Sequence, residues 1–135
     1  MLPKITIVPI VLSEISTAFC RSIGLAIAQA IDKEKVLLVA SSDLYHGYSY
    51  EDCLQSDKHT LKALTQHNPD DFGDGIINGE YRACGGGPIT ALLYAAKQMG
   101  ANAVKVIEKT NSSDVSGVRG DYVVGYAAVA VYKKE

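Results

Sequence analysis

A run of aliphatic residues that ends in an acid and a histidine constrains this chain more than any other feature. Residues 36–40 read Val-Leu-Leu-Val-Ala, and Asp43 and His46 follow within six positions. An aliphatic run without polar alternation predicts a strand buried on both faces, as in a parallel sheet covered by helices. Ligands of open α/β sheets bind beyond the carboxyl ends of strands, so Asp43 and His46 become candidate catalytic residues.

The length and charge of the chain bound its class. Its 135 residues fit a single domain, predicted to span residues 1–135. The formal net charge of −2 gives no basic footprint, so nucleic acid and anionic membranes are disfavoured as partners. Apolar stretches fall short of the roughly 18 to 20 residues that cross a bilayer, and no basic and apolar leader is seen. We expect a cytoplasmic protein.

The order of apolar patterns predicts the fold class. Strands are predicted at residues 4–12, 36–40, 103–109 and 122–132, and helices after Ser13 or Ser16, after Tyr50, after Asn68 and after Pro88. The first helix should end near Asp32, and the second should bury Cys53, Leu54, Leu61 and Leu64. Strands separated by helices indicate a three-layer α/β/α fold with a mixed, mostly parallel sheet. An antiparallel last strand is compatible with this prediction.

Cys84 is the third candidate site residue. It precedes Gly85-Gly86-Gly87-Pro88 at the start of a predicted helix, where free amides and the helix dipole favour a thiolate, which is both a nucleophile and a soft ligand. The competing interpretation is a small apolar residue before a tight turn, and the two weigh about equally. Cys20 and Cys53 lie on apolar helix faces and are predicted to be core residues. Three cysteines without zinc-knuckle spacing indicate free thiols.

Each polar motif also has a structural interpretation. Asp43 could cap its own turn while His46 packs against Tyr45 or Tyr48, and spacing alone favours that interpretation. The glycine triplet could hold a small anion, although it lacks the lysine of a nucleotide-binding loop. The polar segment 111–121 could border the same crevice, but a solvated turn is the stronger expectation. His59 and His67 are expected on helix surfaces.

Four ordered motifs carry a family resemblance that covers essentially the whole chain. They are Ser41-Ser42-Asp43-Leu44-Tyr45-His46-Gly47, Cys84-Gly85 with Pro88, Asn111-Ser112-Ser113-Asp114, and Asp121-Tyr122-Val123-Val124-Gly125-Tyr126-Ala127-Ala128. In this order they resemble the C-terminal half of the Memo family, whose microbial members are called AmmeMemoRadiSam system protein B. The family is similar in fold to class III extradiol dioxygenases, and its proteins look about twice this length.

The resemblance implies a metal-binding pocket. Histidines from the N-terminal half would meet Asp43, His46 and Cys84, with His46 and Cys84 as ligands of iron or copper rather than zinc. Family members are implicated in redox chemistry, and the eukaryotic ones are described as phosphotyrosine-peptide adaptors. The resemblance therefore implies a metal-dependent oxidoreductase of the extradiol dioxygenase kind, or alternatively a non-enzymatic module that binds an anionic or phosphorylated peptide.

The chain departs from the family pattern at one important point. No histidine precedes His46, so two expected ligands are missing. Soft metals need several convergent ligands, and the chain alone should therefore bind metal weakly and is not expected to turn over substrate. A truncation, a domain or a split gene would explain this, and a catalytically inert fragment is the third hypothesis. Because an open sheet edge favours association, we expect a homo-oligomer or a complex with the missing N-terminal half. The sequence selects neither the substrate nor the metal.

Overall fold

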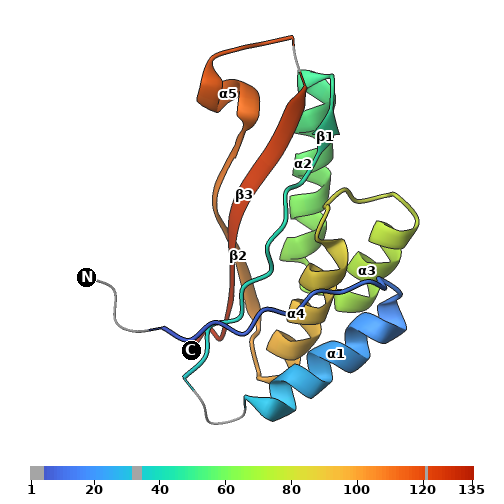
Figure 1. The fold of residues 1–135 in the computed structure, drawn as a ribbon, viewed down its shortest axis with the longest axis vertical. Coiled ribbons are helices and arrows are strands. Elements are labelled where there is room, and N and C mark those ends of the chain that lie inside the picture. Colours follow the sequence, from blue (N-terminus) through green and yellow to red (C-terminus); the bar gives the residue numbers. More distant parts are fainter. Residues whose placement is uncertain (1–4, 32–34, 121) are drawn as a thin grey trace.

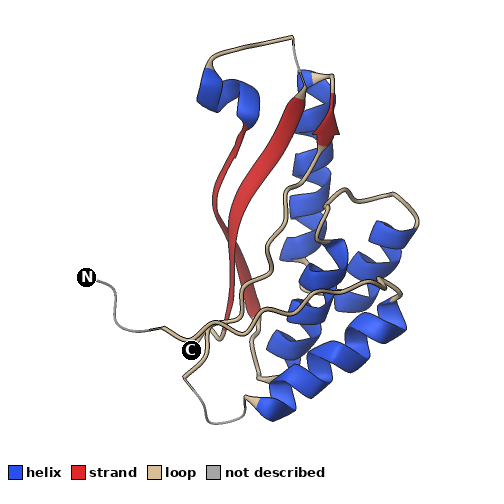
Figure 2. Cartoon of the chain, viewed as in Figure 1, coloured by secondary structure: helices blue, strands red, loops and turns tan. Residues whose placement is uncertain are grey.

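A computed structural model describes residues 5–31, 35–120 and 122–135 of the chain. Figures 1 and 2 show an elongated sheet with helices packed beside it. The elements are α1 (Thr17–Ala30), β1 (His46–Gly47), α2 (Tyr50–Thr65), α3 (Pro69–Ile77), α4 (Gly86–Gln98), β2 (Ala103–Asn111), α5 (Ser112–Ser116) and β3 (Val123–Tyr132). The chain therefore has the predicted α/β class.

Local capping signals set the starts of the helices. The Asn68 side chain accepts hydrogen bonds from the backbone N–H groups of Asp70 and Asp71, and Pro69 occupies the first helical position of α3. Ser16 caps α1 and Ser49 caps α2 in the same way. Helix α3 ends before Gly79, as predicted. Helix α1 ends at Ala30, and Asp32, where its end was expected, lies outside the described residues.

The sheet is antiparallel, so the prediction of a mostly parallel sheet was wrong. Its strand order is β1-β3-β2, with β3 antiparallel to both neighbours, and a bulge interrupts the β2–β3 ladder at Ile107. The short helix α5 joins β2 to β3 and returns the chain beside itself, so that Asn111 pairs with Gly125. A parallel pairing needs a longer crossover that carries the chain back along the strand. Only the option of an antiparallel last strand is confirmed.

The two aliphatic segments at residues 5–12 and 36–40 are extended, but they join no strand ladder. The predicted strands at 4–12 and 36–40 were therefore wrong for the described residues, and Lys4 lies outside them. Residues 36–40 still show alternation: Leu38 and Ala40 are half-buried, whereas Leu37 and Val39 are 85% and 77% exposed. Aliphatic composition creates the demand for burial, but a ladder needs a partner backbone, which the described chain does not supply here.

The core lies between the sheet and two helices. Leu61 and Leu64 of α2 and Leu93 of α4 pack with Leu44, Phe72 and Ala63, against Val106, Ala127, Val129 and Val131 of the sheet. Helices α1 and α3 pack on α4 on the side away from the sheet (Figure 1). The sheet face that carries Ala128 and Tyr132 is exposed. In the described residues the helices thus lie on one face of the sheet, whereas the predicted α/β/α arrangement has helices on both faces.

Helix α2 buries a more polar face than expected. Cys53, Leu61 and Leu64 are buried as predicted, but Leu54 is 46% exposed, and Asp57 and Thr60 are buried instead. None of the described helices is long and apolar enough to cross a membrane. Because of this polar face, the Asp57 carboxylate lies inside the protein, in contact with the segment that carries Asp43 and His46.

Candidate active site

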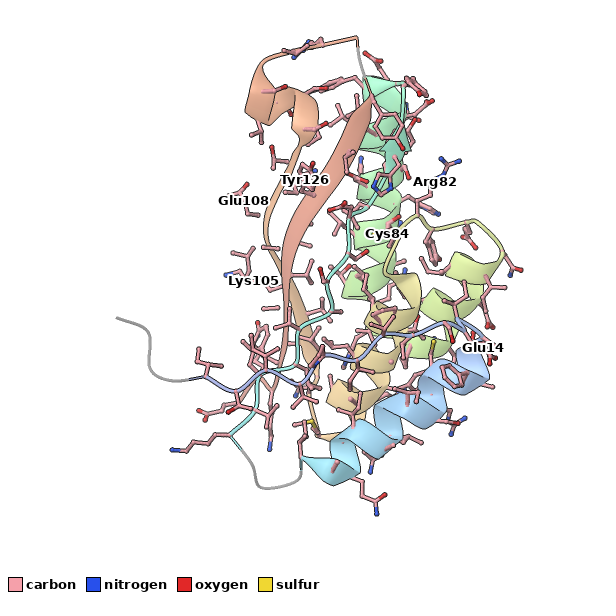
Figure 3. The ribbon with its side chains drawn as sticks, viewed as in Figure 1. Glu14, Arg82, Cys84, Lys105, Glu108 and Tyr126 are labelled. Atoms are coloured by element: carbon pink, nitrogen blue, oxygen red, sulfur yellow. The ribbon has the colours of Figure 1, made fainter. Side chains whose placement is uncertain are left out.

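Asp43, His46 and Cys84 meet at the surface, and we call them the acid–imidazole–thiol cluster. The backbone N–H of Asp43 donates to Cys84 Sγ at 3.1 Å, and the N–H of Cys84 donates to the carbonyl of Asp43, also at 3.1 Å. The Asp43 side chain points the other way, with Oδ2 3.5 Å from His46 Nε2. Asp43 therefore connects the imidazole to the thiol, which the sequence separates by 38 positions. Figure 3 shows Cys84 beside the extended segment that leads into β1.

The hydroxyl of Ser42 joins the two segments that carry the cluster. It accepts the N–H of Gly85 at 2.8 Å, donates to the carbonyl of Asp43 at 2.7 Å and lies 3.7 Å from Cys84 Sγ. No role for Ser42 was predicted from the sequence. Its position beside Asp43 at the end of an aliphatic run was the one signal available, because the partner Gly85 becomes its neighbour only in the fold.

The glycine triplet is required by close packing. A methyl group on Gly85 would lie 2.5 Å from the Ser41 carbonyl oxygen, and one on Gly86 would lie 2.5 Å from Ile76 Cγ2. One on Gly87 would lie 2.8 Å from a methyl of Ile15. All three glycines are buried. The glycines therefore allow the start of α4 to approach its neighbours, and this packing gives the anion-binding interpretation no support.

The imidazole of His46 contacts one end of a pair of tyrosine rings. His46 stacks on Tyr122, with ring centroids 6.3 Å apart, and Tyr122 meets Tyr48 edge to face at 5.1 Å. The stacking partner of His46 is thus Tyr122, whereas the structural interpretation had named Tyr45 or Tyr48. Tyr48 is 81% exposed, so the cluster lies beside an open aromatic surface. The guanidinium carbon of Arg82 lies 5.5 Å from the ring centroid of Tyr45.

The two other thiols are buried, as predicted. Cys20 and Cys53 are fully buried, whereas Cys84 is exposed. Burial raises the pKa of Cys20, and burial together with the nearby Asp57 raises the pKa of Cys53 to about 12. Both are therefore neutral thiols at ordinary pH. Cys84 is the described cysteine that solvent can reach.

The polar segment after β2 is held by its own contacts. The Asp114 carboxylate accepts hydrogen bonds from Tyr50 Oη at 3.0 Å and from Asn111 Nδ2 at 2.8 Å. Asn111 is buried and caps α5. These contacts fasten the segment to α2. The expected solvated turn is found only at the exposed residues 114–120, because Asn111 and Ser113 are buried and residues 112–116 form α5. Asp121, the other acid of the segment, lies outside the described residues.

The remaining histidines lie on or after α2. His59 is exposed, and its Nε2 lies 3.5 Å from Glu80 Oε1, as expected for a surface histidine. His67 differs from the expectation, because it follows the helix with φ of 53° and is partly buried. Burial, followed by the charge of Lys97, lowers the pKa of His67. Neither histidine belongs to the cluster.

The donor set does not make a complete metal site. Thiol and imidazole are suitable ligands for iron or copper, and the carboxylate is a harder donor. Within residues 5–31, 35–120 and 122–135, however, no group of three or more His, Cys, Asp or Glu side chains is placed to hold a metal ion. Cys84 contacts the backbone of Asp43 and not its carboxylate. The described residues of the chain therefore do not fit a metal by themselves.

Comparison with known proteins places the chain in a family. A family model described as Memo-like protein matches residues 1–130. Because the match covers almost the whole length, the chain belongs to the Memo-like protein family.

Curated relatives are named MEMO1 family protein. The one from Methanococcoides burtonii is 37% identical over 111 residues, which are 81% of this chain and 41% of the relative. The one from Caldivirga maquilingensis is 35% identical over 136 residues, which are 98% of this chain and 48% of the relative. The one from Methanocaldococcus jannaschii is 33% identical over 133 residues, which are 95% of this chain and 45% of the relative. The chain thus spans about half the length of the curated relatives it matches.

Proposed function

We propose that this chain contributes the acid–imidazole–thiol cluster to a metal-binding, dioxygenase-like pocket that a second polypeptide segment completes. The observation that carries the proposal is the convergence of Asp43, His46 and Cys84 through direct contacts. In that pocket Cys84 and His46 would be ligands of iron or copper, and the bound metal would supply redox chemistry. The incomplete donor set of the described residues accords with a pocket that is shared between segments.

The chain's own residues would have distinct tasks. The Asp43 carboxylate lies within reach of His46 Nε2 and can orient the imidazole or exchange a proton with it. The Asp43 N–H donates to Cys84 Sγ, and this contact fixes the position of the sulfur. These two contacts place a carboxylate–imidazole pair and a soft sulfur donor at the same surface position.

The second segment has a place to bind. A groove of about 580 Å³ lies between the extended residues 36–40, β3 and helices α2 and α4, and its lining is mostly aliphatic. Residues 5–12 add further exposed aliphatic side chains, including Val11 at 92% exposure. Extended backbone with aliphatic side chains is the surface to which another strand adds. We propose that the occupant is a strand-forming segment from the part of the family's length that this chain does not cover.

Metal analysis tests this proposal. The chain would be purified alone and also together with a second polypeptide. That polypeptide is the part of the Methanococcoides burtonii relative that does not align with this chain. Bound iron, copper and zinc would be measured by mass spectrometry. We expect weak uptake by the chain alone and close to one metal ion per complex. Cys84→Ser and His46→Ala should each reduce uptake at least tenfold.

His59→Ala is the matched control, because His59 is a partly exposed histidine that lies outside the cluster. It should leave metal uptake unchanged. A complex that forms without binding metal would refute the metal function, and self-association that excludes the added polypeptide would show that a second copy of the chain occupies the groove.

A further inference from the structure

The chain makes a β-bulge between Asp43 and His46. Leu44 donates its N–H to the carbonyl of Gly125 at 2.9 Å, and Gly125 donates its own N–H to the carbonyl of Tyr45, also at 2.9 Å. Leu44 and Tyr45 therefore face the single residue Gly125 of β3, which is the defining pattern of a bulge. The N–H of Tyr45 is left without a partner in the sheet.

Asp57 of α2 supplies that partner. Its Oδ1 accepts the Tyr45 N–H at 3.0 Å, and its Oδ2 lies 3.7 Å from Cys53 Sγ. The Asp57 side chain is deep inside the protein, with 7% of the residue exposed. A buried carboxylate is costly unless it is hydrogen-bonded, so the bulge and the acid satisfy each other.

Gly125 makes this contact possible. A methyl group on Gly125 would overlap both carboxylate oxygens of Asp57 and its Cγ. The backbone of β3 therefore passes directly over the acid, which also contacts the buried residues Tyr45 and Cys53.

We infer that Asp57 is a positioning residue for the acid–imidazole–thiol cluster. By accepting the Tyr45 N–H, the Asp57 carboxylate fixes the bulge and sets the direction of the chain on both sides of the bulge. On one side the N–H of Asp43 reaches Cys84 Sγ, and on the other side His46 enters β1 and pairs with Val124. Bulges beside functional sites commonly redirect side chains in this way. The purpose of this arrangement rests on the proposed function, but the geometry can be tested without any metal.

Alkylation of Cys84 reports on the arrangement. Cys20 and Cys53 are buried, so the rate at which iodoacetamide modifies the native protein measures the exposed Cys84. Without its acceptor, the Tyr45 N–H is unsatisfied, the bulge shifts and the Asp43 N–H moves away from Cys84 Sγ. We expect Asp57→Ala to change the alkylation rate by about fivefold, because the Cys84 sulfur loses the backbone contact that fixes its position.

Two variants separate positioning from general stability. Asp57→Asn keeps an oxygen acceptor and nearly the same volume, and should restore alkylation to within about twofold of the natural chain. Leu64→Ala removes core packing one to two turns further along the same helix and should leave the rate of the folded protein unchanged. The inference is overturned if Asp57→Ala reacts at the natural rate while folded, or if Leu64→Ala changes the alkylation rate equally.

A measurement on the natural chain covers the case in which Asp57→Ala does not fold. The Tyr45 amide should be protected from hydrogen exchange to the same degree as the Leu44 and Gly125 amides, although no strand accepts its hydrogen bond. Free exchange of the Tyr45 amide would overturn the inference. Both readouts need no metal, so a protein that binds none would refute the proposed function and leave this inference standing.

Discussion

The helical side of the molecule and its two extended segments contain similar aliphatic residues but have opposite environments. Leu93 of α4 is 1% exposed, whereas Leu37 in the extended segment is 85% exposed. The helices satisfy their own backbone hydrogen bonds and need only one packed face, which α1, α3 and α4 provide for each other (Figure 2). A strand needs a neighbouring backbone as well. Hydrophobicity therefore makes burial of a segment favourable, but an extended segment is buried in a sheet only where a second backbone pairs with it.

Truncating one leucine from each region should give the largest contrast. Leu93→Ala leaves a cavity in the core and should lower the free energy of unfolding by about 2–5 kcal/mol. Leu37→Ala removes a side chain that is already in water and should change it by less than about 0.5 kcal/mol. Urea unfolding followed by circular dichroism measures both. Equal losses would mean that residues 36–40 are buried in solution, by self-association or by closure onto β3.

Charged residues in the extended segment should reduce association. In the chain alone, exposed Leu37 and Val39 favour contact between copies. Leu37→Lys with Val39→Lys should weaken self-association at least tenfold, which is about 1.4 kcal/mol, as measured by sedimentation velocity. Lysines placed at Gln55 and Ser56, outside both aliphatic segments, serve as the control. If the natural chain is already monomeric, the expectation that Leu37 and Val39 drive self-association is wrong.

Removing a helix cap tests how independent the helical side is. Asn68→Ala deletes the acceptor for the first amides of α3 and should lower the free energy of unfolding by about 1 kcal/mol. Asn78→Ala, at the exposed end of the same helix, has no such acceptor role and should cost less. Thermal unfolding of both variants gives the comparison. A larger loss for Asn78→Ala would contradict the capping assignment.

The smallest effect concerns the acid under the cluster. Burial raises the pKa of Asp57, against the opposing effects of the Tyr45 hydrogen bond, the Cys53 thiol, Lys109 and His46. The folded protein therefore takes up this proton at a higher pH than the unfolded chain, whose Asp pKa is about 3.9. The contribution of Asp57 to stability rises as pH falls through the raised pKa, and is complete below the unfolded value.

Asp57→Asn cannot titrate and isolates that contribution. The free energy of unfolding of the natural chain, minus that of Asp57→Asn, should become more positive as pH falls from 7 to 4. Urea unfolding at four pH values provides the measurement, with Asp52→Asn, an exposed acid of the same helix, as the control. A difference that becomes more negative toward acid would show that the hydrogen bond outweighs burial.

Parts of the fold follow from local sequence and parts do not. Asn68-Pro69 marked the start of α3, and the apolar runs at 103–109 and 122–132 were found as β2 and β3, because both kinds of signal depend on near neighbours. Strand direction was mispredicted because it depends on the path of the whole chain. Residues 5–12 and 36–40 were mispredicted because pairing requires a second backbone, and no local pattern specifies whether one is present.

The candidate site divides along the same line. The residue types of Asp43, His46 and Cys84 and the position of the acid and the imidazole after an aliphatic run were readable from the sequence, since they are properties of one short segment each. Their contact through the Asp43 backbone, the hydroxyl of Ser42 on Gly85, and the buried Asp57 beneath Gly125 were decided by the tertiary structure. The physical reason is that hydrogen bonds and close backbone approaches between distant segments depend on packing to within tenths of an ångström, which a one-dimensional pattern of hydrophobicity and charge does not contain.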